Sequence, residues 1–363
     1  MHLFLNSNND LTRSYQIPFC FFLKLFLLLI ASFSLSPVVK GQFYLERVSL
    51  DQLDITLPST RIAGVPGKLH VIDRSCPKLS LSKARGRIVN IAIQEWGFFG
   101  FHILDQTGVS GSSSTGLLSG RAPRLSASES RRLNNTIAGY WSVTPDGDWI
   151  LERQNSVWNG PSGASARWRD PWSAAFISWV MCEGGLSEFD QFQRAIAHHQ
   201  YIDQAIQART NESKAAYTAY DVGELPIEPG DLLCSSRRGT YRSLADRVQS
   251  IGNGVRSHCD IVIDLDKPNQ QVLVIGGNVR GAVRLKLLAA SFYQEDGADV
   301  RVRSVGLGRR TIFAHLKLHS DSVESNVLEN SPTLRSLIQS EGRSSWLRRR
   351  LFLQLRRARE RKD

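Results

Sequence analysis

The segment RDPWSAAFISWVMCEGG, which begins at Arg169, constrains the fold more than any other part of the sequence. Asp170 as an acidic N-cap, Pro171 at the first helical position and two glycines beyond the end predict a helix. The interior of this helix is apolar on nearly every side, which is typical of a helix buried in a core. The chain must therefore fold around it.

The flanking segments predict helices first and strands later. Helical spacing of apolar residues predicts a helix from Ala84 to Phe99 and another from Ser187 to Arg209. After Pro226 the pattern changes to short β-type runs bounded by turn residues. The predicted strands are Asp231–Cys234, His258–Leu265, Gln271–Ile275 and Ala282–Leu287. This order indicates an α+β domain.

The N-terminus predicts export. Ile17 to Leu35 is an apolar run interrupted only by Lys24, preceded by Arg13 and followed by small residues and Pro37. The run is compatible with a cleaved signal or with an uncleaved membrane anchor. We therefore expect an exported protein, either periplasmic or anchored in the inner membrane and facing the envelope.

Composition then divides the chain into regions. Prolines concentrate in the lead-in, glycine and serine in an insertion, and basic residues near the C-terminus. The expected regions are an export signal or anchor over 1–41, an irregular lead-in over 42–83, a folded domain over 84–319 with a Gly/Ser-rich insertion over 108–128, and a basic amphipathic tail over 320–363.

Four cysteines lie outside the export segment: Cys76, Cys182, Cys234 and Cys259. An even number in an oxidising compartment permits disulfides, although buried cysteines also occur as small apolar side chains. Cys234 ends one predicted strand and Cys259 begins another, so a cross-strand disulfide and two separate buried thiols are equal alternatives for this pair. No Cys or His spacing is typical of a zinc site, and we expect no metal and no cofactor.

Three motifs occur in a distinctive order: PWSAAF in the buried helix, EPGDLLC from Glu228, and SHCDIVIDL from Ser257 followed by VIGGNV. Together they resemble the papain-like cell-wall hydrolases of the NlpC and CHAP types, and more closely a bacterial relative known only as a domain of unknown function. The resemblance extends from about Ala84 to about His319. It implies a papain-like fold in which a buried helix carries the nucleophile position and packs on a small antiparallel sheet.

The predicted chemistry centres on Ser173, in the first turn of the buried helix. There, unpaired backbone N–H groups and the positive helix end favour an oxyanion. His258 is the candidate base. The resemblance places the orienting residue at Asn278, whereas Asp260 is a rival because residues two apart on a strand share a face.

The resemblance implies an envelope hydrolase that cleaves amide bonds of peptidoglycan, in the stem peptide or at the muramoyl amide. These hydrolases have cysteine where this chain has Ser173, and a serine hydroxyl is not ionised near neutral pH. An asparagine in place of an orienting aspartate costs a serine triad about 10⁴ in rate. The alternative is an inactive papain-like domain that binds peptidoglycan or an envelope partner.

Other polar and aromatic residues receive subordinate roles. His198-His199 and Asp203 lie on one predicted helix, and we assign them surface or packing roles rather than a metal site. Tyr140 and Trp168, upstream of Ser173, are candidate pocket-wall residues.

The last candidate feature is the charge of the C-terminus. The formal net charge is +11, and much of the excess lies beyond Arg343. Basic clusters alternate there with leucines in WLRRRLFLQLRRARERK, from Trp346, which predicts a partly amphipathic helix. Such a segment suits an anionic membrane surface. We expect a peptidoglycan or muropeptide partner and no nucleic acid, because export separates the chain from nucleic acid.

Overall fold

The computed structural model describes residues 46–49, 52–107, 127–294, 299–307, 310–324 and 326–339. The predicted export segment, nearly all of the Gly/Ser-rich insertion, and the basic tail from residue 340 lie outside these residues. Within the described ranges, no helix has the length and apolar character needed to cross a membrane.

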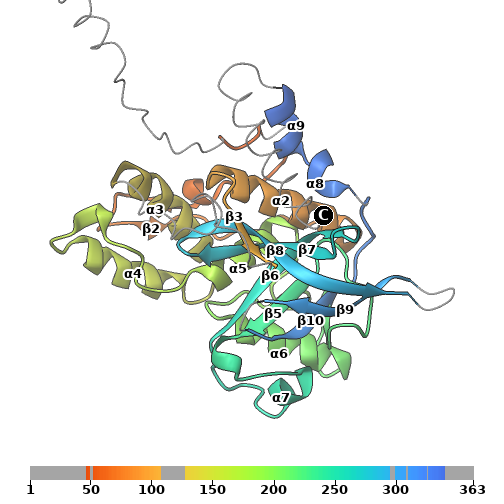
Figure 1. Cartoon of the computed structure of the whole chain (residues 1–363). Coiled ribbons are helices and arrows are strands. Elements are labelled where there is room, and N and C mark those ends of the chain that lie inside the picture. The colour runs from red at the N-terminus through yellow and green to blue at the C-terminus, as the bar shows by residue number, and fades with distance from the viewer. Residues whose placement is uncertain are drawn as a thin grey trace, which may run out of the picture. The chain divides into compact units, whose positions relative to one another are not determined.

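The described helices lie mainly in the first half of the chain and at its C-terminal end (Figure 1). The α-helices are α2 (Ala84–Phe98), α3 (Ala127–Trp141), α4 (Gly147–Trp158), α5 (Ser173–Glu183), α6 (His198–Arg209), α7 (Leu244–Val248), α8 (Val327–Asn330) and α9 (Pro332–Gln339). Short 3-10 turns are η1 (Pro58–Arg61), η2 (Leu81–Lys83), η3 (Gly163–Ser165) and η4 (Arg237–Gly239).

An eight-stranded sheet forms the centre of the fold. Its strands are β3 (Ile103–Gln106), β4 (Tyr217–Tyr220), β5 (Leu232–Ser236), β6 (Ser257–Asp266), β7 (Gln271–Val279), β8 (Ala282–Tyr293), β9 (Arg301–Gly306) and β10 (Ile312–Leu318). The order is β3-β8-β7-β6-β5-β10-β4, and β9 also pairs with β8. A separate two-stranded sheet joins β1 (Ile62–Ala63) to β2 (His70–Val71).

The predicted α+β class is therefore confirmed, and the four predicted strands are present as β5 to β8. The predicted small antiparallel sheet is wrong in two respects. The sheet has eight strands, and β3 runs parallel to β8. Strands β3, β4, β9 and β10 were not predicted. Of these, β3 and β4 have only four residues each, too few for a period-two pattern to be recognised.

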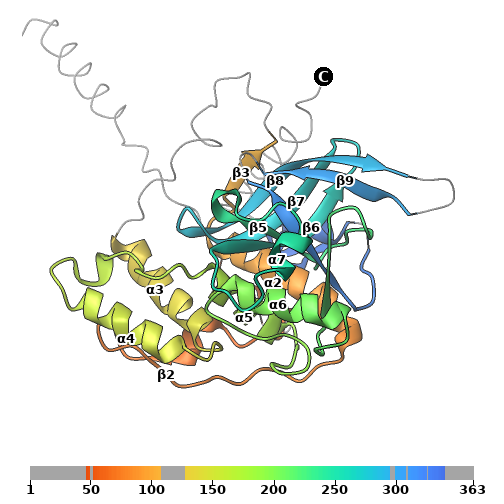
Figure 2. The same ribbon diagram turned by 90° about the horizontal axis from the view of Figure 1, so that it is seen from below.

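Both faces of the central sheet are buried. Helices α2 and α5 contact β6 and β7 on one face (Figure 2). Cys259 and Ile261 of β6 belong to the large core on the helix side, whereas Val262 belongs to a second apolar cluster. Because successive strand residues point to opposite faces, that second cluster lies on the face away from α5. Burial on both sides explains the uninterrupted apolar stretch Ile261–Ile263 in the middle of β6.

Helix α5 confirms the prediction of a fully buried helix, since all eleven of its residues are buried. Its start differs in detail from the prediction. Trp172 occupies the N-cap position without a side-chain cap bond, and Ser173 is the first helical residue. Asp170 instead lies 3.6 Å from a guanidinium nitrogen of Arg153. A well-formed polar cap is not required here because packing holds the helix.

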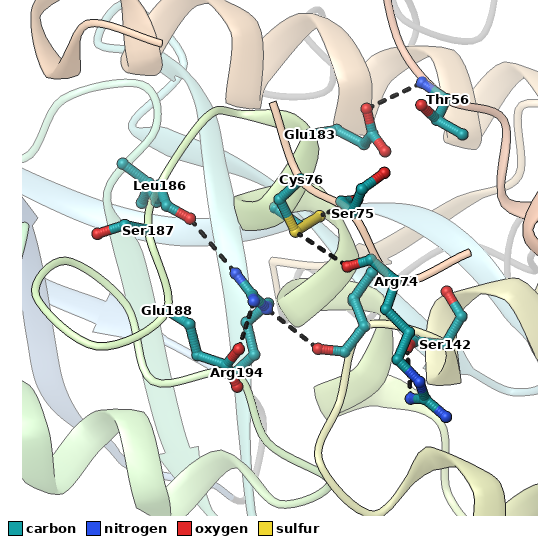
Figure 3. The surroundings of a disulfide bond; sticks show 12 residues. Thr56, Arg74, Ser75, Cys76, Ser142, Glu183, Leu186, Ser187, Glu188 and Arg194 are labelled. Atoms are coloured by element: carbon teal, nitrogen blue, oxygen red, sulfur yellow. Dashed lines mark hydrogen bonds and ion pairs between the residues drawn. A yellow bond between two sulfur atoms is a disulfide. The ribbon is translucent and has the colours of Figure 1, made fainter. Parts of the chain in front are cut away.

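The lead-in before Ala84 is an integral part of the folded domain. Cys76 forms a disulfide with Cys182 of α5, and Arg61 forms a buried ion pair with Glu183. Figure 3 shows this disulfide and the neighbouring Glu183 carboxylate, which also accepts a hydrogen bond from the Thr56 N–H. The lead-in thus contains little regular secondary structure, as predicted. It is nevertheless bonded to the C-terminal end of α5 and holds that end in place.

Two other predicted boundaries are wrong. The tail predicted over 320–363 does not begin at residue 320, because α8 and α9 pack against α2 and their apolar side chains enter the main core. The helix expected from Ser187 begins only at His198, because the preceding residues form a loop bound to α5. In that loop, the Ala195 N–H donates to Ser178 Oγ at 3.0 Å, and Ser178 Oγ donates to the Ala195 carbonyl at 3.1 Å.

Candidate functional site

The loop bound to α5 delivers His198 to Ser173. Ser173 is the first residue of α5 and His198 the first residue of α6. Ser173 Oγ lies 2.7 Å from His198 Nε2, and both residues are buried. A hydroxyl and an imidazole thus meet at the start of two helices, where backbone N–H groups lack intrahelical partners.

The backbone of β6 determines the tautomer of His198. The Cys259 N–H donates a hydrogen bond to His198 Nδ1 at 3.2 Å, and the Tyr201 hydroxyl also contacts this nitrogen. A backbone N–H can only donate, so Nδ1 must carry a lone pair. In neutral His198 the ring proton therefore lies on Nε2, and the imidazole donates to Ser173 Oγ.

Electrostatics keep His198 in this neutral form. Burial lowers its pKa well below the usual value, and the charge of a protonated His258 would lower it further. Protonation would also place a proton on Nδ1, facing the Cys259 N–H. The resting imidazole is consequently a hydrogen-bond donor to Ser173 and a poor acceptor of its proton.

A second polar group, formed by His258, Asp260 and Lys286, lies beside the first. His258 Nε2 is 3.0 Å from Asp260 Oδ1, and the other carboxylate oxygen binds Lys286 Nζ. Burial alone would raise the pKa of Asp260, but the charges of Lys286 and His258 and their hydrogen bonds hold it far below its usual value. Asp260 is therefore ionised.

An ionised Asp260 determines the tautomer of His258. The carboxylate can only accept, so His258 donates through Nε2–H and its Nδ1 carries a lone pair. Burial lowers the pKa of His258, and the opposing effect of Asp260 does not offset this. The His258 and His198 rings meet edge to face with centroids 5.2 Å apart, which joins the two polar groups.

The two glycines of VIGGNV make this arrangement sterically feasible. A Cβ on Gly277 would lie 2.6 Å from Phe176 of α5, so this glycine allows the helix to approach β7. A Cβ on Gly276 would lie 2.0 Å from Asp260 Oδ1 and 3.0 Å from His258 Nε2. Gly276 thus makes room for the His258–Asp260 hydrogen bond, on the opposite face of the strand from Gly277.

The structure changes the predicted set of partners. In the described residues, the imidazole that is hydrogen-bonded to Ser173 belongs to His198, and no such bond joins Ser173 to His258. The face of β6 explains this: Cys259 points toward α5, and His258 and Asp260 therefore point away from it. The packing role assigned to His198 is incomplete, since this residue lies at the centre of the site.

Of the two predicted orienting residues, Asp260 contacts His258 and Asn278 does not. Asn278 has a left-handed φ of 54° and lies in an irregularity of the β7–β8 pairing. Asparagine tolerates this conformation better than most residues, which accounts for its presence at this irregularity.

The aspartate of PGD has a structural role. Asp231 Oδ2 lies 2.8 Å from His315 Nε2, and Asp231 Oδ1 lies 2.9 Å from a guanidinium nitrogen of Arg85. Burial would raise the pKa of Asp231, but the bond with His315 and the charges of His315 and Arg85 hold it below its usual value. This network fastens α2 to β5 and β10.

Two expected pocket-wall residues also have packing roles. Tyr140 is fully buried against Trp172 and Trp179, and its hydroxyl donates to Glu95. Trp168 packs edge to face on Trp158.

Of the two alternatives for the cysteines of β5 and β6, the structure has the disulfide. Cys234 and Cys259 face each other in the β5–β6 register and form a disulfide. This cross-link fixes the strand whose backbone N–H binds His198. Within the described ranges, no cluster of His, Cys, Asp and Glu has the arrangement of a metal site.

Sequence reasoning missed His198 and Lys286. The available signal for His198 was its spacing of three from Tyr201, which places both on one helical face. The expectation of a helix from Ser187 placed His198 in mid-helix and hid this signal. Lys286 alternates with apolar residues on β8, and only the sheet register brings it to Asp260.

This part of the chain is therefore an α+β domain. Its site combines a buried serine–histidine contact with a neighbouring His–Asp–Lys group. Residues 129–294 match the model of a family described as an uncharacterized protein conserved in bacteria (DUF2272). The predicted resemblance to a bacterial domain of unknown function is confirmed over this range, which contains both polar groups of the site and is narrower than the expected 84–319. No curated protein and no solved structure matches the chain.

Proposed function

We propose that this protein is an exported envelope protein whose papain-like domain binds peptidoglycan fragments without using Ser173 as a nucleophile. The observation that carries this proposal is the hydrogen bond from the Cys259 N–H to His198 Nδ1. It makes the imidazole beside Ser173 a donor, whereas a serine nucleophile needs a proton acceptor at that position.

The energetic argument concerns the charged intermediate. A general base holds the serine proton as an imidazolium while the tetrahedral intermediate exists. At His198, burial opposes that charge, and the new Nδ1–H would oppose the Cys259 N–H. The neighbouring carboxylate, Asp260, is already engaged by His258 and Lys286. Proton transfer to His198 is therefore unfavourable.

The proposed location and ligand rest on other features. Two disulfides are compatible with an oxidising compartment, in agreement with the apolar N-terminal run. The order of PWSAAF, PGD, SHCDIV and IGGN supports the papain-like assignment and, through it, a peptidoglycan ligand.

A second candidate function is the hydrolase that the motif resemblance implies, with Ser173 cleaving an amide bond of peptidoglycan. The His258–Asp260 pair favours it, because Asp260 leaves His258 Nδ1 unprotonated and available as a base. This mechanism requires His198 to move away and the His258 side chain to turn toward α5, so that His258 Nδ1 reaches Ser173. Acylation would then transfer the Ser173 proton through His258 to the leaving amine.

The two functions are separated by turnover and binding measurements on the full chain. We expect purified disaccharide-peptide fragments to bind and to remain intact by mass spectrometry, with Ser173→Ala binding as well as wild type. Nitrogen-detected NMR of histidine should show His198 protonated on Nε2 at pH 7. Cleavage by wild type that is lost in both Ser173→Ala and His258→Ala would replace the binding proposal with the hydrolase.

A further inference from the structure

Three arginines meet at one end of the central sheet. Arg237 directly follows β5, and Arg256 directly precedes β6, its antiparallel neighbour. The Arg237 N–H donates to the Arg256 carbonyl at 3.0 Å. Arg310 lies two residues before β10, whose first residue, Ile312, pairs with Ser235 of β5. The register therefore places all three residues together, and we call them the arginine cluster.

The arginine cluster has no counter-charge among the residues that the structure describes. No ion pair there involves Arg237, Arg256 or Arg310, and Arg237 Nε is buried without a hydrogen-bond partner. Burial lowers the pKa of Arg237, and the nearby charges of Arg310 and Arg256 lower it further. Three like charges held together by strand ends cost stability unless a bound anion neutralises them.

The cluster lies next to the polar groups of the site. Arg256 is two residues from His258 on the same chain segment, at the same end of the sheet. The charge of Arg310 acts on His258, and that of Arg237 acts on His198. The one carboxylate of these polar groups, Asp260, is already bonded to His258 and Lys286, so it does not neutralise the arginines.

We propose that the arginine cluster binds carboxylate groups of the ligand, which on the proposed function are the free carboxylates of a peptidoglycan stem peptide. Guanidinium groups suit this ligand because their planar N–H donors match the two oxygens of a carboxylate. Arg256 and Arg310 are exposed and available from solvent, and half-buried Arg237 contributes at the inner side. The ligand's charged end then lies at the strand ends, beside the segment that carries His258.

The test compares muropeptides with free carboxylates and the same molecules after chemical amidation, using calorimetry on the full chain. We expect wild type to bind the free form at least tenfold more tightly. Each Arg→Gln change should weaken binding about threefold, and the triple variant should lose more than tenfold. Arg335→Gln, which removes an exposed charge from α9, should bind like wild type. Equal affinity for both forms, or wild-type affinity of the triple variant, overturns the arginine site while leaving the proposed function intact.

Binding of citrate, a compact tricarboxylate, tests the arginine cluster without depending on peptidoglycan. If wild type binds no muropeptide, the proposed function fails, and citrate then decides the inference alone. Citrate binding that is lost in the triple variant and retained in Arg335→Gln supports a carboxylate site. Absence of citrate binding by wild type in that case overturns it. Unchanged thermal unfolding of the triple variant shows that any loss of binding is not a loss of folding.

Discussion

Two buried histidine–aspartate pairs lie in the same sheet, and their surroundings differ. His315 Nε2 is 2.8 Å from Asp231, and His258 Nε2 is 3.0 Å from Asp260. Each aspartate also binds a cation, Arg85 for Asp231 and Lys286 for Asp260. By local geometry alone, either pair resembles the acid–base residues of an active site.

The neighbours distinguish the two pairs. Asp231 accepts further hydrogen bonds from the backbone N–H groups of Leu318 and Glu228, so its carboxylate is saturated by the fold. His258 contacts the ring of His198, which is bonded to Ser173. The first pair fastens elements together, whereas the second joins a group of polar side chains. A His–Asp pair therefore indicates a functional site only when its free ring face meets other reactive groups.

The cations sharpen the comparison. A guanidinium stays charged at any accessible pH, whereas a buried ammonium can lose its proton. Burial lowers the pKa of Lys286 despite the opposing charge of Asp260. If the carboxylate of Asp231 is removed, Arg85 stays charged in the interior. If the carboxylate of Asp260 is removed, Lys286 can lose its proton and become neutral.

Asp231→Asn should produce the largest effect. It removes the carboxylate that is hydrogen-bonded to the buried Arg85 guanidinium and leaves only the more distant Glu228, at 3.5 Å. We therefore expect a loss of about 3–5 kcal/mol in the free energy of unfolding. Urea denaturation followed by circular dichroism measures the loss. Asp148→Asn, which removes an exposed partner of Arg74, is the matched control and should cost less than about 1 kcal/mol. Equal costs for the two variants would refute the role of Asp231 as a structural hub.

Asp260→Asn should cost less, about 2 kcal/mol near neutral pH, because Lys286 can deprotonate. In this variant the folded pKa of Lys286 falls further below its unfolded value, so the folded state gains stability relative to the unfolded state as the pH rises. The cost relative to wild type should therefore shrink between pH 7 and pH 9. Adding Lys286→Met should remove most of this pH dependence. A cost that does not vary with pH contradicts the proposed difference between the two cations.

The contrast between the two pairs also shows what the sequence could reveal. The mostly apolar segment from Trp172 to Met181 identified a buried helix, and the turn-bounded runs identified β5 to β8, because burial and alternation leave local patterns. Ser173, His258 and Asp260 were found through short motifs on these elements. The partnership of Ser173 with His198 was not found.

That partnership depends on tertiary structure. The loop before α6 is held by Ser178, and the Cys259 N–H that sets the His198 tautomer is a backbone group which any residue supplies. Neither contact leaves a pattern in the sequence. For the same reason, the motif order suggested a base at His258 without revealing which face of β6 it occupies.

Gly276→Ala tests whether the His258–Asp260 pair needs the space that a glycine leaves at position 276. The new Cβ would lie 2.0 Å from Asp260 Oδ1, so Asp260 or the strand must move, and we expect a loss of about 1–2 kcal/mol. Gly306→Ala on β9 is the control, since its Cβ would meet only ordinary contacts from 3.6 Å outward. Chemical denaturation compares the two. A neutral Gly276→Ala would show that the His258–Asp260 hydrogen bond does not depend on this glycine.

Mild acid should weaken the His258–Asp260 pair before it affects the His315–Asp231 pair. Both His198 and His258 have folded pKa values below those of an unfolded chain, so the unfolded state binds more protons once the pH falls below about 6.5. Their contribution to stability is complete above that pH and is lost as the pH falls, by at most about 1.4 kcal/mol per histidine at pH 5.5, one unit below the unfolded pKa. The pKa of Asp231 is lowered, so its contribution persists until the pH falls below about 4. Urea midpoints between pH 7.5 and 5 should therefore decline less steeply in His258→Gln than in wild type, and an exposed-site variant, His70→Gln, should follow the wild-type curve. A decline that His258→Gln leaves unchanged would mean that the folded protein accommodates the His258 charge, which would restore His258 as an acceptor for the serine proton.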